Sequence, residues 1–384
     1  MQVRMLDTEK RRDVQQFVSF PFELYQDCAQ WVPPLVSAAK NVLNRRRHPF
    51  YQHSTADFFV AESEGQTLGR IAVMHNRRYN EYRQVEAALF GYFDVVEDVE
   101  VARALFAAAF EWARGRGLNV MLGPRGLVSS EVGGVLVDGF EHRAALGIPY
   151  NFPYYGGFIE AAGFEKAADF LSGHFQRGHQ VPERLWRVAE KVKARGGFWI
   201  KTFRSKREMR QWIPRVGKIY REAFVEAHTY YPLSNAEMEI MAETIISVAD
   251  PRLIKLVMKG EEVVGFLLTY HDISAGLQKA RGRLWPLGWY YILRERKRTR
   301  WANGNGVGVL PEYQGVGASI LLYAEIAQTM IASDFEHLDV AQVNEDNYPS
   351  RAAMEDVGVQ WYKRHRSYRR MLASTNWHGW ESAV

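Results

Sequence analysis

The 384-residue sequence holds a single cysteine, Cys28. One thiol forms neither an intramolecular disulfide nor a thiolate metal cluster, so the composition is typical of a reducing compartment. The histidine spacings predict no metal site either. His48 and His53, for example, are five residues apart, and that spacing does not put two ligands on one helix face. We therefore expect a cytoplasmic protein without a metal.

Long hydrophobic runs are also missing. The longest apolar stretches, residues 101–113 and 284–293, are interrupted by Arg103 and Pro286 and fall short of the roughly 20 residues that a membrane span needs. Residues 1–13 are charged and have no apolar core of a secretory signal. The sequence thus predicts neither a spanning segment nor a membrane partner.

Charge of one sign is in small excess only. Lys and Arg number 49 against 44 Asp and Glu, a net charge of +5 in a chain with 47% hydrophobic residues. This balance fits a globular protein with an anionic small ligand better than a nucleic-acid binder, whose cations cluster on one element. Walker and Gly-x-Ser-x-Gly sequences are absent, so nothing favours an NTPase or a hydrolase of that type.

The sequence does contain an internal repeat. Residues 58–74 and 253–270 both alternate apolar and polar side chains around a glycine turn, as β-hairpins do. An Asn-x-Pro sequence precedes a short helical pattern in each half, at residues 151–153 and 347–349. Five matched positions lie 195 or 196 residues apart, which predicts two copies of one α/β unit.

We place the boundary between the copies at an amphipathic linker helix that begins near Pro182. Residues 1–180 then form the first domain and residues 181–384 the second. Residues 123–149 are extra in the first copy and are either a substrate lid or a structural excursion. Residues 273–300 are extra in the second copy and end in five cations, which either meet an anionic ligand or form a solvated basic face.

The most informative segment is residues 307–321, VGVLPEYQGVGASIL, where a strand pattern ends at Pro311 and a helix follows a glycine turn. Gly315 and Gly317 remove side chains where the unpaired N–H groups of the first helical turn face outward. The helix dipole favours negative charge at that point. The segment therefore predicts either a pyrophosphate site or a strand-to-helix turn without a ligand.

This segment resembles the phosphate-binding motif of the GCN5-related N-acetyltransferase (GNAT) family, Gln/Arg-x-x-Gly-x-Gly/Ala. Residues 314–319 match the motif, except that Ser319 stands where the family has Gly or Ala. Asn344 or Asn347, followed by Gly358, resembles the family's later motif. The resemblance is carried by the second half of the chain.

The resemblance implies an α/β (α+β) fold of two tandem GNAT-like domains, each a mixed, mostly antiparallel twisted sheet flanked by helices. In the first half, Val96, Glu97 and Asp98 stand where the phosphate turn belongs, and two carboxylates there repel pyrophosphate. The first domain is therefore interpreted as a degenerate copy. Acetyl-CoA, or another acyl-CoA, is expected on the second domain.

The resemblance also implies binding roles in the second domain. Backbone amides of the glycine turn are expected to hold the pyrophosphate, and the preceding strand end to hold the pantetheine and the thioester. The residues expected to bind the cofactor are Val309, Leu310, Gln314, Gly315, Val316, Gly317, Ala318, Ser319 and Asn347.

The catalytic residues depart from the family pattern. The family's thiol-protonating tyrosine falls at Met354, which cannot donate a proton. Either Tyr348 or Tyr323 substitutes for it, or the thiolate leaves unprotonated, or catalysis is weak or lost. The strand before Pro311 carries no Glu, so a base is sought at the end of a helix or hairpin, among Glu226, His228, His271 and Asp272. The catalytic candidates carried forward are Tyr348, His271 and Glu226.

The leading hypothesis is an acyl-CoA-dependent N-acyltransferase, with acetyl as the expected acyl group and a small-molecule or peptide amine as acceptor. One alternative is a non-catalytic acyl-CoA-binding or scaffold protein, which Met354 and the missing base favour. Another is an aminoacyl transferase of the tandem type that builds cell-wall peptides, but those enzymes generally lack the motif at residues 314–319. Nucleic acid is not an expected partner.

Overall fold

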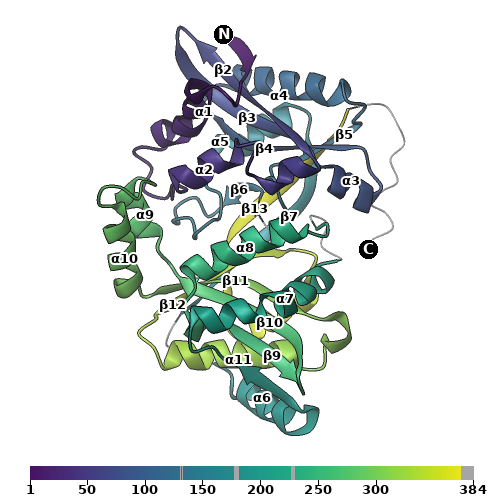
Figure 1. Cartoon of the computed structure of the whole chain (residues 1–384), viewed down its shortest axis with the longest axis vertical. Helices are drawn as coiled ribbons and strands as arrows, with labels where there is room; N and C mark the ends of the chain where they lie inside the picture. Colours follow the sequence, from purple (N-terminus) through teal and green to yellow (C-terminus); the bar gives the residue numbers. More distant parts are fainter. Residues whose placement is uncertain (130, 132, 177–180, 226–229, 373–384) are drawn as a thin grey trace. The chain divides into compact units, whose positions relative to one another are not determined.

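The computed structural model describes residues 1–372 except 130, 132, 177–180 and 226–229. The chain divides into two compact units, whose elements are labelled in Figure 1. The first unit comprises Met1–Phe170, Ser274–Ile292 and the described residues from Lys363 on, and the second comprises Leu171–Ile273 and Leu293–Tyr362. The predicted boundary at Gln180 lies outside the described residues, and the division into 1–180 and 181–384 stays a prediction.

The first unit is built on a sheet in which β1, β2, β3, β4 and β5 pair in that order. Only β4 and β5 are parallel, and β13 pairs antiparallel with both β5 and β6. The strands are β1 (Gln2–Met5), β2 (Thr55–Ser63), β3 (Gln66–His75), β4 (Ala87–Val95), β5 (Val120–Gly123) and β6 (Val135–Asp138). The helices are α1 (Arg11–Leu24), α2 (Val36–Val42), α3 (Arg77–Arg83), α4 (Val99–Arg114), α5 (Tyr154–Ala161) and α9 (Ser274–Ala280).

The second unit repeats this topology. Strands β8, β9, β10, β11 and β12 pair in that order. All neighbouring pairs are antiparallel except β11 and β12, which are parallel. The strands are β8 (Phe198–Lys201), β9 (Lys255–Lys259), β10 (Glu262–His271), β11 (Trp301–Val309) and β12 (His337–Asn344). The helices are α6 (Glu183–Gly196), α7 (Lys206–Ala223), α8 (Asn235–Val248), α11 (Ala318–Ile331) and α12 (Tyr348–Asp356). Three elements have residues in both units: β7 (Glu165–Gln176), α10 (Gly288–Arg298) and β13 (Gln360–Met371).

The repeat predicted from the sequence is confirmed by strand register. In the first unit Gly69 faces Val95, and in the second Gly265 faces Val309. The two glycines are 196 residues apart, so Val95 and Val309 occupy corresponding positions at the ends of β4 and β11. The predicted fold class, a mixed and mostly antiparallel α/β fold, is likewise confirmed.

Local sequence accounts for where several elements begin. Glu64 and Gly65 both have positive φ, which suits the tight turn between β2 and β3. Ser234 and Glu237 form a capping box at the start of α8. The carboxylate of Asp98 accepts the N–H of residue 100 and so caps α4.

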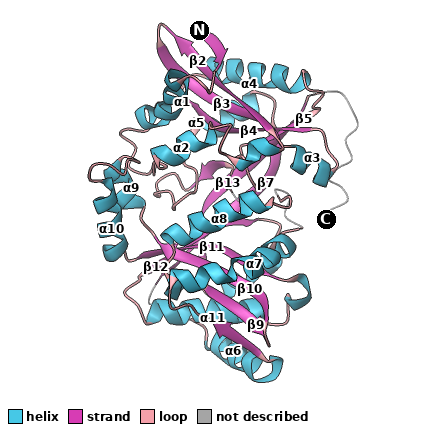
Figure 2. Cartoon of the chain, in the orientation of Figure 1, coloured by secondary structure: helices cyan, strands magenta, loops and turns pink. Residues whose placement is uncertain are grey.

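Helices cover the sheet of the second unit and position its functional edge. Helix α7 packs on β10 and β11, and α11 packs on β9 and β10 with α6 against it (Figure 2). Each of the two extra segments contributes elements to the fold: residues 123–149 supply β6, and residues 273–300 supply α9 and α10. No helix in the described part of the chain is long and apolar enough to cross a bilayer.

Candidate functional site

The parallel strands β11 and β12 separate before they end. Their pairing stops where Gly304 faces Val340, whereas β11 continues to Val309. The register with β10 shifts at residues 305–306, and such a bulge bends the strand at this point. Within the described residues, the carboxyl half of β11 therefore presents an edge that β12 does not cover.

The direction of the backbone groups defines what this edge offers. The N–H of Leu310 donates to the carbonyl of Val264 at 2.9 Å, so Leu310 faces β10. Alternation along the strand then points the backbone groups of Val307 and Val309 away from β10. The carbonyl of Val309 accepts Nε2 of Gln314 at 3.0 Å. Of the two predicted strand-end residues, Val309 thus directs its N–H toward the edge of β11 that β12 leaves uncovered. The N–H of Leu310 is bonded to β10 within the sheet.

A row of unpaired backbone N–H groups follows β11; we call residues 314–319 the cradle. Gly315 and Gly317 have φ of +72° and +100°, and α11 begins directly after them. In the described structure, the N–H groups of residues 315–320 have no acceptor in the protein. Val316 is exposed, and a Cβ on Gly315 would meet open space. The arrangement suits an anion, because amides and the helix dipole both favour negative charge there.

Helix α6 packs against the start of α11. Its apolar face consists of Leu185, Ala189 and Val192. A Cβ on Gly317 would lie 2.3 Å from Cγ2 of Val192. Glycine at 317 is therefore required both by its left-handed φ and by the approach of α6. The next two residues are buried (Ala318) and half-buried (Ser319).

The predicted residues on α12 have separate roles. The side chain of Asn347 caps the helix by accepting the N–H of Ser350 at 3.1 Å. Tyr348, the first residue of the helix, is 68% exposed, so its hydroxyl is open to solvent. Met354, at the position where the family has a tyrosine, is buried in the core of the second unit. Tyr323 on α11 is half-buried, and burial raises the pKa of its hydroxyl to about 12.

His271 lies at the opposite end of β11 from the cradle. It faces Ala302, seven residues before Val309, which is about 23 Å along an extended strand. The structure therefore does not bring His271 to the cradle. The other two predicted bases at the end of a helix, Glu226 and His228, lie outside the described residues.

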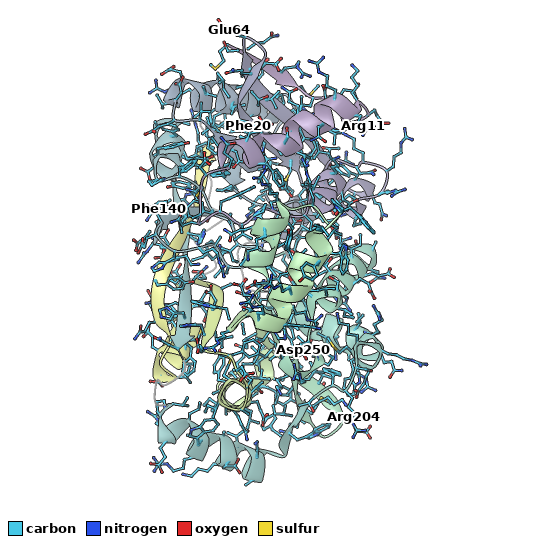
Figure 3. The ribbon with its side chains drawn as sticks, turned by 90° about the vertical axis from the view of Figure 1, so that its left-hand side faces the viewer. Arg11, Phe20, Glu64, Phe140, Arg204 and Asp250 are labelled. Atoms are coloured by element: carbon cyan, nitrogen blue, oxygen red, sulfur yellow. The ribbon has the colours of Figure 1, made fainter. Side chains whose placement is uncertain are left out.

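His271 is instead part of a separate contact. Its Nε2 lies 3.0 Å from Oδ2 of Asp250, which is labelled in Figure 3, and its ring packs against Phe335 at 5.0 Å. Hydrogen bonds from His271 and Arg252 hold the pKa of Asp250 well below its usual range. Asp272, the residue after His271, is buried.

A buried polar cluster lies where β11 and β12 begin to separate. Asn303 on β11 faces Asp339 on β12, and both are almost fully buried. The hydroxyl of Tyr362 donates to Oδ2 of Asp339 at 2.8 Å, and Nδ2 of Asn305 donates to the hydroxyl of Tyr270 at 2.6 Å. Because Tyr270 faces Asn303 in register, the side chains of Asn303, Asp339 and Tyr270 share one face of the sheet.

Two properties make this cluster suitable for polar chemistry. Nδ2 of Asn303 is buried and has no hydrogen-bond partner among the described residues. Burial, together with the charges of Asp272 and Asp339, raises the pKa of Tyr270 to about 12, so its hydroxyl remains protonated at neutral pH. The cluster is not predicted from the sequence, because the family pattern points to the strand before Pro311 and to the ends of a helix or hairpin. The available signal was Asp339, a charge inside the strand pattern of residues 337–344.

The corresponding strand end of the first unit is occupied by the protein itself. The N–H of Val95 donates to the hydroxyl of Tyr155 at 3.0 Å, and the carbonyl of Val95 accepts the hydroxyl of Tyr154 at 2.9 Å. The carboxylate of Asp98 accepts the N–H of Glu100 in the first turn of α4. Both backbone groups of Val95 and one amide of the following helix are thus hydrogen-bonded within the first unit.

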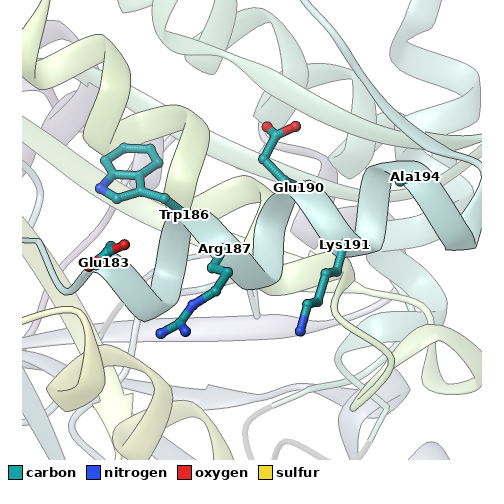
Figure 4. A pocket seen from close by; sticks show the side chains of 6 residues that line it. All are labelled: Glu183, Trp186, Arg187, Glu190, Lys191 and Ala194. Atoms are coloured by element: carbon teal, nitrogen blue, oxygen red, sulfur yellow. The ribbon is translucent and has the colours of Figure 1, made fainter.

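A shallow pocket on α6 is shown in Figure 4. It is lined by Glu183, Trp186, Arg187, Glu190, Lys191 and Ala194. These residues recur every three or four positions and form the face of α6 that is turned away from its apolar face. No cradle residue lines this pocket, so it is separate from the amide row at α11.

Comparison with known sequences gives two relatives that align over nearly their whole length. No protein-family model matches the chain. The chain is 26% identical over 373 residues to Protein YghO of Escherichia coli (strain K12), covering 94% of each protein. It is 24% identical over 369 residues to the bacterial ceramide synthase of Caulobacter vibrioides (strain NA1000 / CB15N), covering 94% of this chain and 95% of that protein.

Comparison with solved structures identifies the fold. The tandem GNAT protein from the clavulanic acid biosynthesis pathway superposes with a TM-score of 0.57 and 14% sequence identity, covering 98% of this chain and 99% of that chain. At this identity the likeness concerns the fold, and it agrees with the repeated topology and with the separation of β11 from β12. The chain therefore has the fold of a tandem GCN5-related N-acetyltransferase, with two units of this kind.

Proposed function

We propose that the protein is an acyl-CoA-dependent N-acyltransferase that binds its acyl donor on the second unit. The observation that carries the proposal is the uncovered edge of β11, which is followed after residues 310–314 by the unpaired N–H groups of residues 315–320 at the first turn of α11. An acyl-CoA has the complementary parts in the same order, because an amide-containing pantetheine arm connects its thioester to a pyrophosphate.

In this proposal the N–H groups of residues 315–320 bind the pyrophosphate. The pantetheine amides pair with the backbone of Val307 and Val309, as an added strand would. The thioester carbonyl then lies where β11 and β12 separate. A backbone N–H directed at the developing oxyanion contributes on the order of a few kcal/mol to transition-state stabilisation. Leu310 and Asn347 act indirectly, by holding the strand end and α12 in place.

The reaction needs one group that takes a proton from the amine and one that returns a proton to the thiolate. We assign the first role to Asp339, because it is a buried carboxylate at the point of strand separation and Tyr362 fixes its orientation. We assign the second role to Tyr348, whose exposed hydroxyl stands at the start of α12, four residues beyond the end of β12. His271 has no role in this scheme.

The acceptor is proposed from chemistry and from one relative. A ceramide is the amide of a long-chain amino alcohol, and one relative that aligns over 94% of this chain is named a bacterial ceramide synthase. We propose that this chain likewise acylates a long-chain amino alcohol. Its donor is an acyl-CoA, and thiol release measured with acetyl-CoA and with a long-chain acyl-CoA distinguishes which acyl group it takes.

The first unit is proposed to be a degenerate copy that binds no acyl-CoA. The hydroxyls of Tyr154 and Tyr155 already bond both backbone groups of Val95, and Asp98 places a carboxylate at the first turn of α4. An incoming pantetheine would have to displace these hydrogen bonds, and a pyrophosphate would meet like charge.

Val316→Glu tests the donor site. Val316 is exposed and has no positive φ, so the substitution changes the charge of the cradle without straining the fold. Repulsion between the new carboxylate and the pyrophosphate is expected to raise the KM for acyl-CoA at least about tenfold. Val316→Gln, which matches Glu in size, is expected to stay near the wild-type value. The measurement is release of the free CoA thiol in the presence of a long-chain amino alcohol.

Two results would contradict the proposal in different ways. Equal kinetics for Val316→Glu and Val316→Gln would mean that the pyrophosphate is not bound at the cradle. Tight binding of acyl-CoA without thiol release, on short and long amines alike, would instead identify a non-catalytic acyl-CoA-binding protein.

A further inference from the structure

The connection between β10 and β11 concentrates exposed apolar side chains. Fifteen large hydrophobic residues are exposed in the described chain, and six of them fall within residues 284–293. Trp285 is 80% exposed and Leu287 is 56% exposed. The six residues, which we call the apolar tip, are Leu284, Trp285, Leu287, Trp289, Tyr290 and Leu293. A contiguous patch of this kind on a folded protein marks an interaction surface.

The base of the apolar tip is fixed to the first unit. The carbonyl of Gly282 accepts the N–H of Val36 at 2.8 Å. Nε2 of Gln278 donates to the carbonyls of Ala29 and Trp31, each at 2.8 Å. The exposed side chains are therefore presented by an ordered, hydrogen-bonded connection, and their exposure does not result from a missing fold contact at its base.

Cations flank the apolar tip on both sides along the chain. Residues 274–300 contain eight Lys and Arg but one carboxylate, Glu295, whereas the whole chain has a net charge of only +5. The remainder of the protein is thus slightly negative, and the positive charge is local to this segment. The exposed cations are Lys279, Arg281 and Arg283 before the tip and Arg294, Lys297, Arg298 and Arg300 after it.

Helix α10 shows how the two kinds of side chain are arranged. Trp289, Leu293 and Lys297 are exposed and recur every four residues, so they lie along one face of the helix. The exposed face changes from aromatic and aliphatic residues at its N-terminal half to cations at its C-terminal half. A helix with this gradient can insert its apolar end into an interface between hydrocarbon and water, while its cations stay in the aqueous phase.

We propose that the apolar tip and its flanking cations dock the protein on an anionic phospholipid bilayer surface. Trp and Tyr rings settle at the level of the lipid headgroups, and Lys and Arg beside them are attracted to anionic lipids. A bilayer fits better than a protein partner because this segment has eight cations and a single carboxylate, and a surface of one charge sign suits an anionic lipid surface. The sequence predicted no membrane partner on the length of its apolar runs, which tests for spanning segments and not for surface docking.

The proposal is tested by flotation of the full chain with vesicles of phosphatidylcholine, with and without phosphatidylglycerol. The protein is expected to float with the anionic vesicles and to remain behind with the neutral ones. Trp285→Ser with Leu287→Ser is expected to weaken partitioning at least about tenfold, because two inserted side chains are lost. Lys279→Gln with Arg281→Gln and Arg283→Gln is expected to weaken it about a hundredfold and to remove the preference for anionic lipid.

The matched control is Trp199→Ser with Ile240→Ser, which removes two exposed apolar side chains from elsewhere on the chain and should float like the wild type. Wild-type protein that floats with neither kind of vesicle would overturn the proposal, as would undiminished flotation of the tip variant. A tip variant that dissociates a wild-type dimer without changing flotation would assign the surface to a second copy of the chain, which also overturns it. None of these outcomes depends on acyl transfer, so the test is independent of the proposed function.

Discussion

Val95 and Val309 occupy the same position in the two units but differ in what their backbone groups bond. Two tyrosine hydroxyls bond the N–H and the carbonyl of Val95. The carbonyl of Val309 has one side-chain donor, Gln314, and its N–H faces the opening. The hydroxyls of Tyr154 and Tyr155 and the carboxylate of Asp98 therefore occupy the strand end of the first unit. The corresponding strand end of the second unit leaves the N–H of Val309 without such a partner.

Asp339→Asn tests the proton chemistry at the residue scale. Loss of a positioned proton acceptor is expected to lower kcat at least about a hundredfold. The KM for acyl-CoA should change little, because Asp339 does not belong to the amide row that binds the donor. Steady-state kinetics with varied acyl-CoA separate the two parameters.

The control for this variant is Asp334→Asn, an exposed carboxylate shortly before β12, which should retain wild-type kcat. If Asp339→Asn kept more than half of the wild-type kcat while remaining folded, another group would have to accept the proton. A parallel rise in KM would indicate that the substitution disturbs the donor site.

At the scale of elements, the important contact is between α6 and Gly317, the residue that directly precedes α11. Helix α6 fills the space beside Gly317 with Val192, and Lys193 of the same helix lies 3.4 Å from Glu325 of α11. The helix that the sequence predicts as a linker thus helps to fix the start of the helix whose amides form the cradle.

Gly317→Ala measures this contact. A left-handed φ and a methyl group 2.3 Å from Val192 together are expected to lower the free energy of unfolding by about 2–4 kcal/mol. Val192→Ala removes the opposing methyl groups, so the double variant should be less destabilised than the sum of the two single variants. Urea denaturation of the four proteins gives the coupling. Strict additivity would mean that α6 does not press on residue 317.

Elements held by local sequence were predictable, and those held by distant partners were less so. The sequence predicts a β-hairpin at residues 58–74, which β2 and β3 form. It places the start of the second-unit strand at Val307, whereas β11 begins at Trp301. The intervening residues, WANGNG, have low strand propensity, and they are extended because β10 and β12 pair with them on either side.

The same distinction applies to the candidate site. The cradle is readable from the sequence because a strand end, two glycines and a helix start are adjacent in the chain. The cluster of Asn303, Asp339 and Tyr270 is formed by three strands whose register the sequence does not specify. His271 is a reasonable candidate by position in a hairpin, and the antiparallel pairing places it beside Ala302, one residue from Asn303 but on the opposite face of the sheet.

At the scale of the whole molecule, a duplicated fold is proposed to carry one donor site. Both units keep the hairpins, the parallel strand pair and the helix that follows it. The second alone, among the described residues, keeps an open strand end followed by unpaired amides. The first unit instead contains the base of the apolar tip. Donor binding and surface docking are therefore proposed for different parts of the chain.

Titration calorimetry of acyl-CoA into the full chain tests this division most directly. We expect one molecule bound per chain in the wild type and in Val316→Gln, and an affinity weakened at least about tenfold in Val316→Glu, because the cradle of the second unit binds the pyrophosphate. Two molecules bound per wild-type chain, or an unchanged binding curve for Val316→Glu, would contradict it.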